Sequence, residues 1–284
     1  EGPIDYRDPV TFFKKTYLTH GLSNLLLDAL QRLSGEQRGE AVVQIQTPFG
    51  GGKPHVLIAL YHLMGHSDQT EHLPSIGSLL EDAGLETIPD CRVAALIGTA
   101  LDPTQGRRTE DGLQVRTLWG EMAYQLGGTP LYREIEASDQ NQVSPGTDRL
   151  SDLLEGLGPV VVLIDEALEY ATKAGGISVG EGTLLGQTLS FLQELSTVTA
   201  HRSQTMLVGA LPSSYLERFD ASAQKAFQQL SKIFGRLEQV RTPVEGAEIY
   251  EILRRRLFEH VGEEAERRKV AEAYWDFYQA HASD

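Results

Sequence analysis

The sequence is poor in cysteine and in long apolar runs, and each shortage excludes a class of protein. Cys91 is the single cysteine of 284 residues, which excludes an internal disulfide and argues against a zinc site built from thiolates. The longest apolar runs, such as residues 160–164, are far too short to span a bilayer. The opening residues EGPIDYRDP are acidic and turn-rich, unlike a signal peptide, and no methionine precedes them. We therefore expect a cytoplasmic fragment of a longer protein, without a membrane partner.

Basic residues are also scarce. Lysine and arginine number 25 against 40 aspartates and glutamates, which gives a net charge of −15. This balance argues against a general nucleic-acid-coating surface, although it leaves room for a local basic patch. Two basic clusters, residues 254–256 and 267–269, lie among glutamates in predicted helices, where pairing at i,i+4 on a solvated face is the better interpretation. DNA contact is therefore expected only through other regions.

What the chain does contain is an alternation of apolar strands with helix-periodic segments. Strands are predicted at residues 42–45, 92–98, 160–164 and 205–211, with a short fifth strand at 237–240. Such alternation predicts an α/β fold, a five-stranded parallel sheet between helices. We expect an N-terminal helical segment at 1–40, an α/β core at 41–242, and the start of a helical region at 243–284. Residues 8–34 of the first segment are predicted to be helical. Within the core, residues 66–90 are predicted to form a polar connector.

The most informative stretch is AVVQIQTPFGGGKPHVLIALYHLMGH, residues 41–66. A β-branched run leads into three glycines and a lysine, and a helix-periodic segment follows; this order is typical of a P-loop. Glycines allow backbone N–H groups to face an anion, the helix start adds its positive dipole end, and the lysine adds a full charge. The residues expected to bind nucleotide are Phe49, Gly50, Gly51, Gly52, Lys53, Pro54 and His55, with Lys53 on the β- and γ-phosphates.

This loop departs from the usual pattern G-x-x-x-x-G-K-[ST] at two positions. Thr47 stands where the first glycine belongs, and Pro54 stands where a serine or threonine belongs. That hydroxyl normally ligates Mg²⁺ and its N–H contacts phosphate, whereas proline supplies neither. Proline is well tolerated in the first turn of a helix, so the fold is not threatened. His55 is a candidate to contact phosphate or Mg²⁺-bound water in place of the missing hydroxyl.

A second acidic site follows further along the chain. The buried run at residues 160–164 ends in Asp165 and Glu166, which is the form of a Walker B strand. Side chains of adjacent residues at a strand end point in different directions, so Asp165 can hold Mg²⁺ while Glu166 polarises the attacking water. The simpler alternative is that a buried strand ends in polar residues at a loop. Together with the glycine loop, the pair predicts an ATP and Mg²⁺ site.

The chain resembles a family of bacterial and archaeal AAA+-like P-loop ATPases that is associated with anti-phage defence because its genes lie in defence islands. The resemblance covers nearly the whole chain. In this family the loop usually has threonine and histidine after GGGK, so His55 matches the family and Pro54 does not. The lack of the first glycine, at Thr47, is common in the family. The stretches that carry the resemblance include YRDPVTFFKKTYLTHGL at 6–22, QTPFGGGKPHVLIALYHL at 46–63, IGTALDP at 97–103, VLIDEALEYA at 162–171 and FGRLEQVRTPVE at 234–245.

The resemblance implies further site residues. In the AAA+ superfamily a polar residue ends the strand between the Walker A and Walker B strands, which makes Ser213 or Ser214 the candidate sensor. An arginine finger lies just before the last core strand, where Arg236 is the first candidate and Arg241 the second. Either feature could instead be ordinary, a turn in one case and a surface ion pair in the other. A finger would imply a homo-oligomer or a larger defence complex with shared active sites, and residues 243–284 would begin the helical lid.

Two functions remain open at this point. The first is a Mg²⁺-dependent ATPase in which hydrolysis drives remodelling within a phage-defence complex. The second is a nucleotide-binding scaffold with weak or no hydrolysis, which Pro54 favours and Glu166 opposes, since a pure binder needs no base. A nucleic-acid-binding module that merely retains the fold is disfavoured by the net charge.

Overall fold

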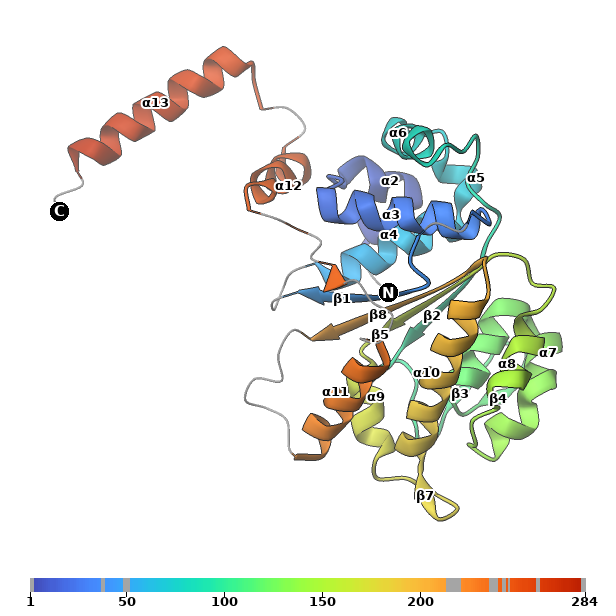
Figure 1. Ribbon diagram of the computed structural model, residues 1–284. Coiled ribbons are helices and arrows are strands. Elements are labelled where there is room, and N and C mark those ends of the chain that lie inside the picture. Colours follow the sequence, from blue (N-terminus) through green and yellow to red (C-terminus); the bar gives the residue numbers. More distant parts are fainter. Residues whose placement is uncertain are drawn as a thin grey trace.

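A parallel β-sheet forms the centre of the protein. The computed structural model describes residues 3–36, 39–47, 52–212, 221–234, 240–241, 244, 246–258 and 261–281. The strands are β1 (Val42–Thr47), β2 (Arg92–Ile97), β5 (Val160–Asp165), β8 (Thr205–Pro212) and β9 (Val240–Arg241). They lie in the order β2-β5-β8-β1-β9, and every neighbouring pair is parallel (Figure 1).

The predicted parallel α/β sheet is confirmed for its four long strands, which have six to eight residues each. The fifth differs from the prediction of residues 237–240. Among the described residues it is a two-residue pairing, in which Val240 and Arg241 lie opposite Gln44 and Ile45 of β1. The sheet therefore has four full strands with a short contact at the β1 edge.

Helices cover both faces of the sheet (Figure 1). On one face lie α1 (Ile4–Arg7), α2 (Pro9–Lys15), α3 (His20–Leu33), α4 (Lys53–Gly65), α5 (Ser67–Thr70) and α6 (Pro74–Ala83). On the other lie α7 (Leu118–Gln140), α8 (Thr147–Leu154), α9 (Ala167–Ala174), α10 (Leu184–His201) and α11 (Ala221–Phe234). Two small hairpins, β3 (Arg107–Arg108) with β4 (Gln114–Val115) and β6 (Ser178–Val179) with β7 (Gly182–Thr183), complete the core region.

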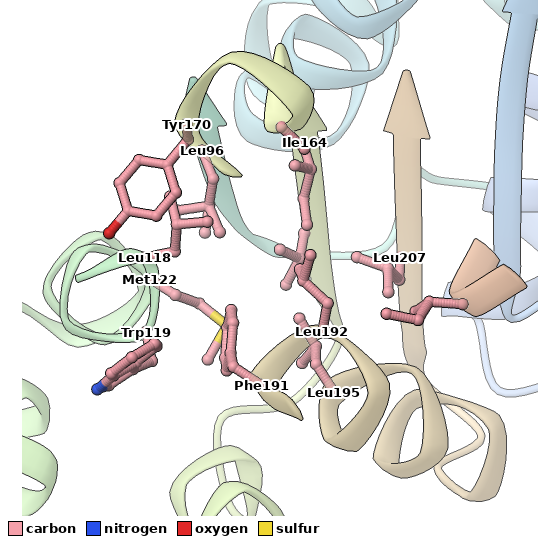
Figure 2. Close-up of a cluster of buried hydrophobic side chains, with 14 of the residues drawn as sticks. Leu96, Leu118, Trp119, Met122, Ile164, Tyr170, Phe191, Leu192, Leu195 and Leu207 are labelled. Atoms are coloured by element: carbon pink, nitrogen blue, oxygen red, sulfur yellow. The ribbon is translucent and has the colours of Figure 1, made fainter. Parts of the chain in front are cut away.

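Burial on both faces explains why the sequence of strand β5 is continuously apolar. Val161 and Leu163 belong to the hydrophobic cluster under α3 and α4, whereas Val160, Val162 and Ile164 belong to the opposite cluster. A strand covered on both faces needs apolar residues at every position, because successive side chains alternate between the faces. Figure 2 shows the second cluster, in which Ile164 and Leu207 of the sheet face side chains from α7 and α10.

Two predicted segments differ from the structure. The helix expected over residues 8–34 is interrupted between α2 and α3, because the Thr16 hydroxyl donates to the Phe12 carbonyl (2.7 Å) and Thr19 caps α3 by accepting from the Leu22 N–H (3.2 Å). The polar connector expected at residues 66–90 contains α5 and α6. Its buried face, with Ile76, Leu79 and Leu80, packs into the cluster shared with α3.

The last two helices differ from the others. Helices α12 (Glu248–Leu257) and α13 (Glu264–Ala280) contain no buried residue, and α13 extends away from the sheet in Figure 1. Helix α12 contacts the N-terminal region: Glu248 accepts from the His20 N–H (2.7 Å), and Arg255 Nε donates to the Lys14 carbonyl (3.0 Å). Across the described ranges, no helix is both long enough and apolar enough to cross a membrane.

A buried aspartate fixes α7, which closes the outer edge of β2. Asp139 is fully buried at the end of α7 and accepts hydrogen bonds from the Thr117 N–H (2.9 Å), the Arg116 N–H (3.1 Å) and the Tyr132 hydroxyl (2.8 Å). It thereby ties the last turn of α7 to its first. From the same helix, the Gln125 amide accepts from the Ala95 N–H (2.7 Å) and donates to the Ala95 carbonyl (3.0 Å).

We expect Asp139→Ala to lower the free energy of unfolding by about 3 kcal/mol or more, because several buried donors lose their acceptor together. Asp139→Asn is the matched control and should lose less, since its remaining carbonyl oxygen can still accept from Thr117. Urea unfolding of the three proteins gives both values. An alanine variant within about 0.5 kcal/mol of the parent would contradict this role of Asp139.

Candidate functional site

The start of α4 has the backbone geometry expected of the end of the glycine-rich loop. Residues 48–51, which include Phe49, Gly50 and Gly51, lie outside the described residues. Gly52 has a left-handed backbone (φ 84°, ψ 14°), and a Cβ added there would meet nothing within 4 Å. Such a φ favours glycine. Lys53 and an exposed Pro54 then form the first turn of α4, whose free N–H groups and dipole attract anions.

Asp165 ends β5 in a half-buried position. Burial raises the pKa of its carboxyl group, the charge of Glu166 raises it further, and the Glu166 N–H and the charge of Lys53 lower it. The carboxylate therefore carries a desolvation cost that a nearby cation would offset. Asp165 lines the same cavity as Pro54, the neighbour of Lys53, so the start of α4 and the end of β5 border a common space. No group of three or more histidine, cysteine, aspartate or glutamate side chains in the described part of the chain could hold a metal ion.

Glu166 has a strained backbone next to the end of β2. It is exposed, and its φ of 52° and ψ of 31° are left-handed, a conformation that costs a non-glycine residue about 1–2 kcal/mol. Its carboxylate accepts a hydrogen bond from the Thr99 hydroxyl, and its N–H donates to Asp165 Oδ1 (2.9 Å). Gly98 allows this approach, because a Cβ there would lie 2.1 Å from the Glu166 carbonyl oxygen.

Two cavities are lined by residues at the start of α4. One, of about 810 Å³, is lined by Pro54 from α4, Asp165 from β5 and Ile97 from β2. The other, of about 430 Å³, is lined by Gly52 and Val56 together with apolar and polar side chains of the N-terminal region and α12. Those additional residues include Tyr17, Thr19, Leu22, Ile249 and Leu253. The arrangement can therefore hold an anionic group at the helix start with space on either side of it.

The ring of His55 is hydrogen-bonded on both sides. Thr16 uses its hydroxyl hydrogen on Phe12, so it accepts from His55 Nε2 (3.1 Å), and His55 Nδ1 then accepts from Arg256 Nη2 (3.0 Å). Burial and the charge of Arg256 lower the pKa of His55 to about 4, so the ring is neutral at pH 7. Both ring nitrogens are occupied by protein groups, so the ring has no nitrogen free to replace the missing hydroxyl toward phosphate or Mg²⁺-bound water.

Of the remaining predicted site residues, most lie outside the described part of the chain. Ser213, Ser214 and Arg236 are outside the described residues, and Arg241 is placed only through its backbone in β9. The strand that leads to the two serines, β8, does lie between β1 and β5, as the resemblance implied.

The sequence interpretation missed three contributors to the site. Thr99 could have been found as a polar residue that follows the strand next to β5. Tyr17 and Arg256 carried no such signal, because they approach α4 only through long-range packing.

The acid stability of the protein should depend on His55. Its pKa is about 4 when folded and near 6.5 when unfolded, so the unfolded chain binds the proton first as pH falls. The neutral ring of His55 contributes fully to the free energy of unfolding above pH 6.5. That contribution falls as the pH is lowered toward 4, by about 2 kcal/mol between pH 6.5 and 5. We expect His55→Gln to show a correspondingly flatter dependence in chemical unfolding at these pH values. Equal pH slopes for the two proteins would contradict this account of His55.

The strain at Glu166 gives a second prediction. Glu166→Gly should raise the free energy of unfolding by roughly 1 kcal/mol, because glycine adopts the left-handed backbone without steric cost. Glu166→Gln retains the Cβ and serves as the control, which should remain near the parent. Thermal and urea unfolding measure the difference, and a glycine variant less stable than the glutamine variant would contradict the strain.

Comparison with known proteins gives a family. None of the curated proteins compared with the chain matches it. A family model described as the DUF499 N-terminal domain matches residues 1–249, which include the described site from Gly52 to Glu166. Most of α12 and all of α13 lie beyond the matched residues. Because the match covers most of its length, the chain belongs to the DUF499 N-terminal domain family.

Proposed function

We propose that the protein is an AAA+-like P-loop ATPase that binds ATP with Mg²⁺ and hydrolyses it. The observation that carries the proposal is one cavity that is lined by Pro54, next to Lys53 at the start of α4, and by Asp165, next to Glu166 at the end of β5. In open α/β sheets, ligands bind outside the carboxyl ends of the strands, and both segments lie there. A helix start with a lysine suits phosphate groups, and an adjacent acidic pair suits a metal-dependent hydrolysis.

The residues present fit a magnesium nucleotide. Asp165 offers one half-buried carboxylate whose raised pKa reflects a cost that a divalent cation would offset. Mg²⁺ binds readily through one or two carboxylates, with phosphate oxygens and water completing its octahedron, so a larger protein cluster is not needed. The chemistry it supplies when bound is neutralisation of charge on the phosphate oxygens. Asp165 would hold it, and Lys53 would bind the β- and γ-phosphates.

Glu166 is the proposed base. Its exposed carboxylate stands beside Asp165, and the Thr99 hydroxyl fixes its orientation. A carboxylate held in this way can orient a water molecule and accept its proton as the water attacks. The apolar cavity lined by Val56, Leu22 and Leu253 would receive the nucleotide base, with Tyr17 and Thr19 at its side.

Pro54 supports a second candidate, a nucleotide-responsive scaffold with weak or no turnover. The loss of one hydrogen bond to a charged group costs about 1.5–3 kcal/mol, which corresponds to roughly 10- to 150-fold in affinity. Assembly into a homo-oligomer or a phage-defence complex, with Arg236 reaching a neighbouring site, belongs to the proposal and rests on the family resemblance alone.

The decisive experiment measures nucleotide affinity and turnover with and without Mg²⁺. We expect Glu166→Gln to keep its affinity for ATP while turnover falls about 100-fold or more. Pro54→Thr should tighten Mg²⁺-dependent binding by roughly 10- to 150-fold. Glu169→Gln, an exposed acid on the next helix turn, is the matched control and should behave as the parent.

The outcomes separate the candidates. Turnover that is equal in the parent and Glu166→Gln would remove the proposed base, and binding without turnover in both the parent and Pro54→Thr would favour the scaffold. A parent that binds no nucleotide in either condition would overturn both. The molecular size should be measured with and without nucleotide, because an arginine finger acts only across a subunit boundary.

A further inference from the structure

A basic cleft lies between the end of α2 and helix α12, and it shares Tyr17 and Arg256 with the smaller cavity at the start of α4. It has a volume of about 710 Å³ and is lined by Lys14 and Lys15 from α2 and by Arg254, Arg255 and Arg256 from α12. The two helices lie next to each other in Figure 1, and Arg255 Nε joins them through the Lys14 carbonyl (3.0 Å). Neither Lys53 nor the acidic pair of β5 lines this cleft.

The cleft concentrates positive charge in a chain whose net charge is −15. Among the described residues, carboxylates pair with two of its five cations: Asp5 with Lys15 (2.9 Å) and Glu251 with Arg254 (3.0 Å). Lys14 has no ion pair there, and Arg255 contacts a neutral carbonyl. Residues 254–256 were predicted to pair at i,i+4 along their own helix; among the described residues only Arg254 pairs there, and it does so at i,i+3. The other arginines instead face α2 and the N-terminal region.

Within the described residues, the contacts of Arg256 are all with neutral groups. Its Nη1 donates to the Tyr6 hydroxyl (2.6 Å), its Nη2 donates to His55, and its guanidinium lies 5.2 Å from the centre of the Tyr6 ring. Its charge therefore adds to the potential of the cleft without being neutralised by a carboxylate. Among the residues described, three of the five cations, Lys14, Arg255 and Arg256, therefore have no carboxylate partner.

Aromatic and apolar groups line the same cleft. Tyr17 is half-buried at one side, and Phe258 and Leu257 are exposed by 57% and 67% at the other. A groove that combines cations with accessible aromatic faces is the arrangement that binds single-stranded nucleic acid, because the cations contact the backbone and the bases stack on the rings. Bases within a duplex are already stacked and cannot use these rings.

We propose that this cleft binds single-stranded nucleic acid, with Lys14 and Arg255 on its phosphates and Phe258 and Tyr17 stacked on its bases. This function goes beyond nucleotide hydrolysis and does not depend on it. It uses a surface that forms only when α12 lies against α2, since each helix supplies part of the charge.

The test is binding of a fluorescently labelled oligothymidine to the whole chain, followed by anisotropy from about 50 to 200 mM salt. We expect a dissociation constant of roughly 1–100 µM that weakens as salt rises, as for sequence-independent binding. Lys14→Gln with Arg255→Gln should weaken binding at least tenfold. The same pair should also reduce the salt slope by about 1.4, about 0.7 for each lost phosphate contact.

Two further variants test stacking and helix docking separately from charge, and a control pair tests the effect of charge elsewhere on the surface. Phe258→Ala should weaken binding by about 5- to 150-fold and leave the salt slope unchanged, because it removes a stacking surface and no charge. Lys14→Gln alone keeps the Arg255 contact to the Lys14 carbonyl, so its loss of affinity cannot come from undocking of α12. Arg108→Gln with Arg133→Gln, on the opposite side of the sheet, removes the same charge and should bind as the parent.

Three results would overturn the proposal. They are no binding by the parent at 50 mM salt, equal weakening by the control pair and the cleft pair, and displacement of the oligothymidine by a duplex as efficient as by unlabelled single strand. The last result would indicate a general attraction to phosphate in place of a cleft that stacks bases.

Discussion

The approach of the start of α4 to the acidic end of β5 depends on one constraint: parallel strands end at the same edge of a sheet. The glycine-rich stretch leaves β1 at that edge, and Asp165 and Glu166 leave β5 there, with β8 between the two strands. Burial of the strands on both faces holds their ends in register, because sliding one strand would move apolar side chains out of two hydrophobic clusters. The packing of the sheet therefore fixes where the start of α4 and the acidic pair lie relative to each other.

The site itself departs from what would make the fold most stable. Asp165 carries a desolvated charge, and Glu166 has a backbone that glycine would adopt at lower cost. The surrounding structure compensates for these costs: Gly98 makes room for the Glu166 carbonyl, and the apolar residues of β5 fix the strand. Strain and unfavourable solvation gathered at the end of one buried strand are typical of residues whose positions are set by function.

The sequence predicted the features that arise from local patterns. The four long strands, the acidic pair and the helix after the glycines all follow from the period of apolar residues and from turn chemistry. Local pattern could not predict the break between α2 and α3, which depends on the hydroxyls of Thr16 and Thr19. Nor could it predict the contact of Arg256 with His55, since these residues lie 201 positions apart and meet only when α12 docks. The position of β8 between β1 and β5 came from family resemblance, because periodicity carries no information on strand order.

The Gln125 side chain has a consequence for how copies of the protein can associate. Strand β2 is an edge strand, and an exposed edge invites another chain to add a strand to the sheet. Gln125 already satisfies the N–H and the carbonyl of Ala95 in the middle of that edge, as the backbone of a neighbouring strand would. Growth of the sheet from one molecule into the next is therefore hindered at the centre of β2. Contacts between copies on this side of the sheet would therefore form through side chains and not by strand addition.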